Sequence, residues 1–259
     1  MTPISVFIIA KNEADRITPI INSVKDLAQE IIVIDSNSSD DTVKICQNLG
    51  AKVINNDWQG YGQQKIFGEN LCQNNWILNI DADEEVSTEL AQEIKNIFSQ
   101  KISDEVAGFR IKIVNKFRFE DKPKKLAYFY NQLRLYRKDY AGFKNSLVHD
   151  SVELKSNSNY QISQLKNIIY HQSFRSFSHW FDKINSYSSM QAQDAFLKNK
   201  KPCYFKIFLS PILAFFKAYF IRRYFIYGLD GIIYSIIFAF SRFAKAIKTK
   251  ELFTEKNKS

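Results

Sequence analysis

Four short apolar runs, separated by polar stretches, dominate the first hundred residues. They are Ser5–Ala10, Ile31–Ile34, Ala51–Ile54 and Trp76–Ile80. Each run is rich in β-branched or aromatic side chains, which is typical of strands buried in a parallel sheet. The hydrophobic pattern therefore predicts four buried strands in this part of the chain.

Helix-start signals follow three of these runs. Thr18 with Pro19 predicts a capped helix start, Ser38–Asp41 followed by Thr42 predicts a second, and Ser87 with Glu89 predicts a third. Strands that alternate with helices at this spacing indicate an α/β doubly wound fold.

The pattern loosens after about residue 105. Val106–Val114, Leu133–Tyr136 and Val148–Leu154 predict further strands of mixed direction, and the basic, aromatic segment 115–130 predicts a loop. The chain changes character near Ser173, and helical signals dominate from Trp180 to the end.

The helical tail carries large apolar residues at helical spacing. They are Phe205, Phe208, Leu209, Ile212, Leu213, Phe216 and Phe220. Pro211 should kink this helix. The helices could pack on the sheet as core, or they could lie in a membrane surface. The many aromatic side chains beside Lys and Arg favour the second interpretation.

Targeting signals are absent from the pattern. No secretory signal is expected, because the N-terminal apolar run is short and has no basic residues before it. No uncharged apolar stretch reaches the roughly 18–20 residues that span a bilayer.

Charge is divided unevenly along the chain. Residues 1–100 carry 7 Lys and Arg against 15 Asp and Glu, while residues 101–259 carry 29 against 12. The acidic half argues against a nucleic-acid partner. The basic, aromatic half points to an anionic membrane surface. The three cysteines lie far apart without a zinc-binding spacing, so no zinc site is expected.

The motif Asp81-Ala82-Asp83 directly follows the fourth predicted strand. Ligands of open α/β sheets bind beyond the carboxyl ends of the strands. Two carboxylates at this position could address one Mg²⁺ or Mn²⁺ ion, which would neutralise charge on a diphosphate leaving group. An acidic loop that faces a helix dipole is the simpler alternative.

Two more strand ends carry polar residues. Asp35 ends the second predicted strand and could accept hydrogen bonds from a base or ribose. Lys11 and Glu13 follow the first strand and could flank a nucleotide. No glycine-rich dinucleotide or P-loop motif occurs there, which disfavours both of those nucleotide sites.

Together, the three motifs resemble glycosyltransferase family 2. They are Ala10–Glu13, Val33–Thr42 and Asp81–Glu84. The resemblance implies an inverting enzyme with the GT-A fold, a Rossmann-like domain with a mostly parallel sheet. It implies that Glu13 and Asp35 contact the nucleoside of a UDP-sugar donor, that Asp81 lies near the ribose or diphosphate, and that Asp83 binds the metal.

Further segments resemble the subfamily that glucosylates heptose in the lipopolysaccharide inner core. They are Gly60–Lys65, Leu147–Val152, His171–Phe174 and Tyr227–Gly231. This resemblance implies that Lys65 lies near the nucleotide and that the acceptor is a lipid-linked glycan. Relatives often have Glu after the first His, whereas this chain has Asp150, whose side chain is one methylene shorter.

Inverting transfer requires a carboxylate that takes the proton of the acceptor hydroxyl. Asp150 is the preferred general base, and His149 would orient the acceptor, although the pair could also be structural. The other candidate bases are Glu153, Asp139 and Glu120. For His171 and Asp230 we expect core or capping roles.

These expectations divide the chain into two parts. Residues 1–175 form the GT-A domain, with a nucleotide-binding half (1–100) and an acceptor half (101–175). Residues 176–259 form a basic, aromatic, membrane-associating helical region. The protein is expected in the cytoplasm, peripheral on the inner membrane.

Two other classes explain the pattern less completely. A sugar nucleotidyltransferase should have a glycine-rich basic loop where this chain has Ala10–Glu13. A non-catalytic adaptor for membranes or polyanions would explain the basic tail but not the carboxylates at three strand ends.

Overall fold

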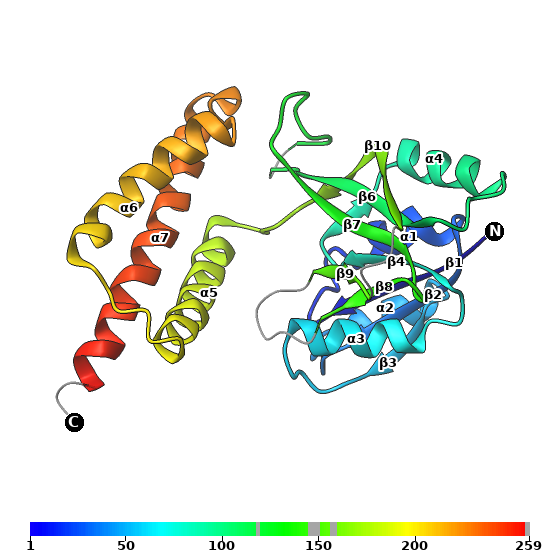
Figure 1. Cartoon of the computed structure of the whole chain (residues 1–259), viewed down its shortest axis with the longest axis horizontal. Helices are drawn as coiled ribbons and strands as arrows, with labels where there is room; N and C mark the ends of the chain where they lie inside the picture. Colours follow the sequence, from blue (N-terminus) through cyan, green and yellow to red (C-terminus); the bar gives the residue numbers. More distant parts are fainter. Residues whose placement is uncertain (118–119, 145–150, 156–159, 257–259) are drawn as a thin grey trace. The chain divides into compact units, whose positions relative to one another are not determined.

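The computed structural model describes the chain except for residues 118–119, 145–150, 156–159 and 257–259 (Figure 1). The chain forms two compact units. The first contains residues 1–114 and 129–172, and the second contains residues 115–128 and 173–259. The segment 115–128 therefore groups with the C-terminal helices instead of the acceptor half. Phe117 explains this grouping, because its ring stacks on that of Tyr234 with 4.1 Å between ring centroids.

An eight-stranded sheet forms the first unit, in the order β3-β2-β1-β4-β7-β6-β10-β5. Its strands are β1 (Thr2–Ala10), β2 (Ala28–Asp35), β3 (Lys52–Asn55), β4 (Trp76–Asp81), β5 (Glu84–Val86), β6 (Val106–Asn115), β7 (Phe129–Arg137) and β10 (Gln161–His171). β1 to β4 pair in parallel, whereas β7 pairs antiparallel with β4 and β6. A separate two-stranded sheet contains β8 (Ala141–Phe143) and β9 (Val152–Leu154).

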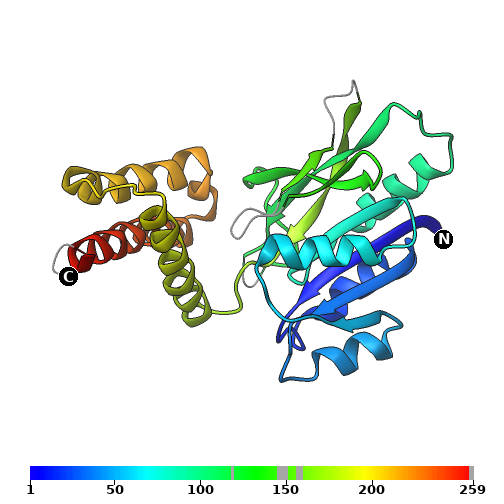
Figure 2. The same cartoon turned by 60° about the horizontal axis from the view of Figure 1, so that its bottom comes forward.

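Helices cover both faces of the large sheet (Figure 2). They are α1 (Ile17–Lys25), α2 (Thr42–Asn48), α3 (Tyr61–Leu71) and α4 (Thr88–Phe98). The buried side chains of α1, α2 and α4 join one hydrophobic cluster, while apolar residues of α3 pack on a second cluster. The predicted α/β fold with a parallel core and C-terminal helices is confirmed.

Helix starts agree with the sequence in one case and differ in another. Ser87 caps α4, because its Oγ accepts a hydrogen bond from the Leu90 backbone N at 3.1 Å. The prediction for α1 was wrong, because that helix begins at Ile17 and contains Thr18 in its first turn.

The second unit is helical. It contains α5 (Phe177–Leu197), α6 (Tyr204–Phe216), the π-helix η1 (Lys217–Ile221), the 3-10 helix η2 (Tyr224–Tyr227) and α7 (Leu229–Lys256). α7 packs against both α5 and α6. Among the described residues, one helical stretch, Tyr204–Ile221, is long and apolar enough to cross a membrane, and 17% of it is buried.

Candidate active site

The parallel strands bring two of the predicted carboxylates to one edge of the sheet. Strand pairing places Asp35 opposite Ala10 of β1, and Asp81 opposite Ile9 on the other side of β1. Both aspartates therefore lie at the carboxyl edge of the sheet, as the strand-end argument predicts.

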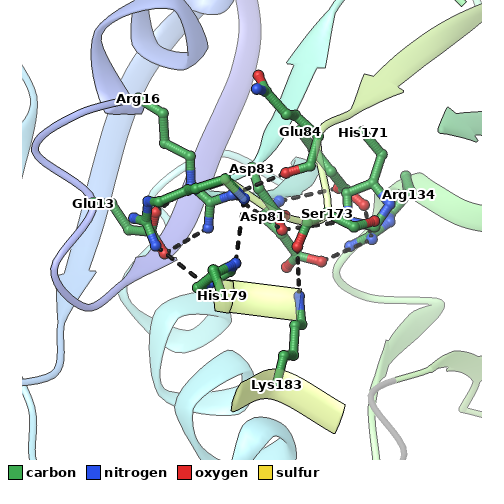
Figure 3. A network of polar contacts seen from close by, with 12 residues as sticks. Glu13, Arg16, Asp81, Asp83, Glu84, Arg134, His171, Ser173, His179 and Lys183 are labelled. Carbon is green, nitrogen blue, oxygen red and sulfur yellow. Dashed lines mark hydrogen bonds and ion pairs between the residues drawn. The ribbon is translucent and has the colours of Figure 1, made fainter. Parts of the chain in front are cut away.

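Asp81 lies between two cations. Its Oδ1 is 2.8 Å from Nζ of Lys65. Its Oδ2 is 3.1 Å from Nη2 of Arg134, and Figure 3 shows these two residues together. Lys65 comes from α3 and is completely buried. Because its Nζ contacts Asp81, its charge lies at this edge of the sheet. Burial by itself would raise the pKa of Asp81, but the charges of Lys65 and Arg134 outweigh it and hold that pKa well below its usual range.

Arg134 of β7 connects three acceptors at this edge. It donates from Nη1 to Asn79 Oδ1 at 2.6 Å, and from Nη2 to Asp81 Oδ2 and to Glu84 Oε1, the last at 2.7 Å. Burial raises the pKa of Glu84 and the Asp81 charge adds to this, while the Arg134 charge opposes it. Arg134 was not predicted as a site residue, although an arginine between Leu133 and Leu135 in a buried strand is a usable signal.

Asp83 faces His171, for which a core or capping role was predicted. The Asp83 Oδ2 is 3.4 Å from Nε2 of His171 and 3.8 Å from Nη1 of Arg16. His171 reaches this position because it ends β10 and pairs there with Glu84 of β5. Figure 3 shows His171 directed toward the carboxylates.

These residues fit a metal ion that is shared with a ligand. Within the described part of the chain, no three His, Cys, Asp or Glu side chains are grouped closely enough to hold a metal. Asp83 and His171 nevertheless offer an oxygen and a nitrogen close together. Mg²⁺ and Mn²⁺ commonly combine one or two protein carboxylates with phosphate oxygens and water. The site therefore fits a metal held jointly with a diphosphate.

The turn after β1 carries Lys11 and Glu13. Lys11 is exposed at the strand end. Both carboxylate oxygens of Glu13 accept hydrogen bonds from the guanidinium of Arg16, Oε1 at 3.0 Å from Nη2 and Oε2 from Nε. Arg16 also donates to the Gln172 backbone carbonyl at 2.9 Å. The Arg16 guanidinium therefore holds the Glu13 carboxylate in place at the edge of the site.

Asp35 has a structural partner as well. Its Oδ2 accepts from the Ser38 backbone N at 2.8 Å, and its Oδ1 accepts from the Ser38 Oγ at 2.5 Å. The turn that starts α2 therefore already uses this carboxylate. Each oxygen keeps a second lone pair for a further donor.

The candidate bases fall in different places. His149 and Asp150 lie outside the described residues. Asp139 follows β7, whose Arg137 pairs with Trp76 at the start of β4, so it lies at the opposite edge of the sheet from Asp81. The β4 strand between these edges is about 17 Å long. Asp139 is therefore excluded as the base.

The two remaining alternatives lie in other elements of the chain. Glu153 lies in β9 and forms an ion pair with Lys144. Glu120 belongs to the second unit, and burial raises its pKa.

The family model for glycosyl transferase family 2 matches residues 5–153. The chain belongs to glycosyltransferase family 2. It is therefore a glycosyltransferase that uses a nucleotide sugar, with the α/β fold of this family.

Relatives support the same assignment over nearly the whole chain. An uncharacterized glycosyltransferase of Rickettsia felis is 47% identical and covers 97% of this chain and 90% of its own length. The lipopolysaccharide core biosynthesis glycosyltransferase LpsC of Rhizobium meliloti is 28% identical and covers 95% of this chain and 91% of its own length.

One similar solved structure is glucosyl-3-phosphoglycerate synthase from Mycobacterium tuberculosis, in complex with Mn²⁺, UDP and glucosyl-3-phosphoglycerate. It is 22% identical, with a TM-score of 0.35, and the match covers 46% of this chain and 45% of that chain.

Proposed function

We propose that this family 2 enzyme transfers glucose from UDP-glucose to a lipid-linked glycan of the lipopolysaccharide core, with inversion at the anomeric carbon. The pathway is supported by the similarity to LpsC over 95% of the chain. The reaction would take place on the cytoplasmic face of the inner membrane, where the basic half of the chain would meet the acceptor.

The arrangement around Asp81 is the observation that carries this proposal. A fully buried lysine and a nearly buried arginine converge on one carboxylate at the edge where nucleotides bind in α/β sheets. The two cations hold Asp81 ionised and in one orientation, so that it can accept hydrogen bonds from a ribose. Lys65 and Arg134 also make this edge less repulsive to a diphosphate.

Asp83 and His171 would hold the metal. A bound Mg²⁺ or Mn²⁺ supplies positive charge to the leaving diphosphate. The Asp83 carboxylate would supply an oxygen donor, and His171 would supply a nitrogen donor 3.4 Å from Oδ2 of Asp83. Glu13, Asp35 and Lys11 would contact the nucleoside from the neighbouring strand ends.

Asp150 would accept the proton of the attacking acceptor hydroxyl, and His149 would position that hydroxyl. The described residues on both sides of that segment support this proposal. Phe143 pairs with Val152, two residues after Asp150, and the Phe143 ring centroid is 5.5 Å from Nζ of Lys65. The chain thus enters and leaves the segment that contains Asp150 near the proposed donor site.

A thermal-shift comparison of UDP, GDP and dTDP, each with and without Mn²⁺, tests the donor class. Ligand binding stabilises the native state by mass action, so UDP with Mn²⁺ should raise Tm the most. Asp83→Ala should lose the Mn²⁺-dependent part of this shift, and Asp139→Asn, at the opposite sheet edge, should keep it. A larger shift with GDP or dTDP would overturn the UDP assignment.

Transfer to purified core oligosaccharide tests the reaction and its base. Asp150→Asn should bind UDP normally and lose about 10²–10⁴-fold in transfer rate. NMR of the product should show a β-linkage formed from the α-linked donor. Normal turnover in Asp150→Asn would move the base to another carboxylate, and a retained α-configuration would rule out inversion. Consumption of UTP and a sugar phosphate, without transfer, would instead indicate a nucleotidyltransferase.

A further inference from the structure

The outer face of α6 and η1 exposes large apolar side chains in a continuous row. We call this row the α6 face. It consists of Phe205 (72% exposed), Phe208 (68%), Ile212 (54%), Leu213 (58%), Phe216 (51%) and Phe220 (58%). A soluble surface seldom gathers apolar side chains of this size without a partner.

The α6 face is one side of an amphipathic helix. Apart from the adjacent pair Ile212 and Leu213, its members recur every three or four residues, which places them on the same side of the helix. The opposite side carries Ile207, Ala214 and Ala218, which are buried in the contact with α7. Figures 1 and 2 both show α6 and α7 lying side by side. The α6 face therefore points away from the helix that holds α6 in place.

α7 contributes a second exposed stripe near its start. This stripe consists of Leu229 (80% exposed), Ile232 (37%), Ile233 (43%), Ile236 (55%) and Phe240 (45%). Their spacing also follows one side of a helix. The hairpin of α6 and α7 thus has more exposed apolar surface than α6 alone supplies.

The charges around the α6 face identify the kind of partner. Between Asp194 and Asp230 the chain has seven Lys and Arg residues and no Asp or Glu. Lys206 and Lys217 are exposed and eleven residues apart, about three helical turns, so both project from the same side of α6, beside the apolar row. Aromatic side chains bordered by cations complement an anionic lipid surface, where rings enter the acyl boundary and ammonium groups meet phosphates.

The lysine positions also decide between lying on the membrane and crossing it. Lys206 and Lys217 are about 16 Å apart along a helix axis, less than the roughly 30 Å thickness of the hydrocarbon core. A spanning helix centred on this stretch would place both lysine backbones within that core, so both side chains would have to snorkel out of it. A helix parallel to the surface keeps both ammonium groups at the headgroups. Pro211, in the middle of α6, further disfavours a straight spanning helix.

We propose that the α6 face docks the protein on an anionic membrane, with α6 lying parallel to the surface and its aromatic side chains inserted at the acyl boundary. This docking specifies how the proposed transferase meets a lipid-linked acceptor. It needs neither donor nor turnover, so it can fail or succeed separately from the proposed function.

Co-sedimentation of the full chain with vesicles tests the docking. Binding should be strong with phosphatidylcholine–phosphatidylglycerol vesicles, weak with phosphatidylcholine alone, and reduced by salt. The double variant Phe208→Glu/Phe216→Glu should bind about tenfold or more weakly, because it places charges where the rings insert. Lys206→Glu/Lys217→Glu should lose the preference for the anionic vesicles.

Leu197→Glu is the matched control, because Leu197 is 73% exposed in the same unit but lies outside the α6 face. It should bind vesicles as the unchanged protein does. Circular dichroism and UDP-induced thermal shifts should be equal in all variants, which separates docking from folding and from donor binding.

Three further outcomes would overturn the proposal. Equal vesicle binding by the Phe208→Glu/Phe216→Glu variant would show that the α6 face is not the docking surface. Self-association of the unchanged protein in light scattering, abolished in that variant and without vesicle binding, would identify a second copy as the partner. Resistance of the membrane-bound protein to alkaline carbonate extraction would contradict the surface orientation of α6.

Discussion

The carboxyl edge of the parallel strands and the α6 face satisfy their side chains in opposite ways. At the strand edge, Lys65, Arg134, Asp81 and Glu84 pair with one another within the protein. On the α6 face, aromatic side chains such as Phe205 and Phe208 remain more than two-thirds exposed. The charges of the first region are paired within the protein. The apolar side chains of the second region have to be covered by a partner outside it.

This difference separates two kinds of functional surface. A donor site must keep its charges in fixed positions before the ligand arrives, because preorganised groups bind and catalyse without rearrangement. A membrane-docking face needs area and charge sign more than fixed positions. Substitutions at the strand edge should therefore change stability and turnover. Substitutions on the α6 face should change how much of the protein binds to membranes.

The largest effect on stability is expected for Arg134→Leu. This change leaves the buried Glu84 without the Arg134 cation and removes one of the two cations beside the partly buried Asp81, which should cost about 3–5 kcal/mol of unfolding free energy. Urea denaturation of the purified protein measures it. Arg242→Leu on α7 is the control, because Arg242 is exposed and its guanidinium carbon lies 5.1 Å from the centroid of the Phe238 ring. Its cost should stay below about 1 kcal/mol. Equal costs would contradict internal compensation at the strand edge.

The next largest effect is expected for Asp83→Ala, and it should fall on turnover. Removing the carboxylate that is proposed to bind the metal should lower kcat/KM for UDP-glucose about a hundredfold or more, roughly 3 kcal/mol. The unfolding free energy should change little, because Arg16 keeps its hydrogen bonds to Glu13 and to the Gln172 carbonyl. Asp104→Ala is the control, since Asp104 is 85% exposed and pairs with Arg137 away from this edge. Unchanged turnover in Asp83→Ala would refute the metal assignment.

The elements that the sequence predicts well are those with a local pattern. The four apolar runs were found as β1 to β4, and Ser87 was found as the cap of α4. α3 was missed because its buried positions include Gln64, Lys65 and Glu69, so its inward face does not show the hydrophobic period of an ordinary helix.

The site residues that were missed arrive through pairing between distant segments. Arg134 reaches Asp81 because β7 pairs with β4, and His171 reaches Asp83 because β10 pairs with β5. Local periodicity carries no information on such antiparallel partners. β10 itself was not predicted, since polar residues interrupt its apolar ones. The amphipathic tail was recognisable, but its exposed face depends on a partner that the chain does not encode.

A smaller effect is expected in the pH dependence of stability. The folded-state pKa of Asp81 lies below its ordinary value of about 3.9, so its pairing stabilises the protein fully above that value. This stabilisation is lost as the pH falls below about 4, because the unfolded chain then binds the proton first. Asp81→Asn should be less stable at pH 7 and should lose less stability between pH 5 and pH 3. An identical slope in both proteins would show that Asp81 is not held ionised by Lys65 and Arg134.

The smallest expected effect tests whether the two units, one with the strand edge and one with the α6 face, are equally well folded. Ser87 begins α4 and Ser176 begins α5, and each Oγ accepts a hydrogen bond from a backbone N three residues on, at 3.1 and 3.0 Å. Ser87→Ala and Ser176→Ala should each cost about 1 kcal/mol of local stability. Amide hydrogen exchange in the first turns of α4 and α5 measures both. Ser99→Ala, at an exposed helix end, should change exchange by less than about 0.5 kcal/mol. If only Ser87→Ala has an effect, α5 is already open in solution, and the helices would need the membrane for their order as well as for their partner.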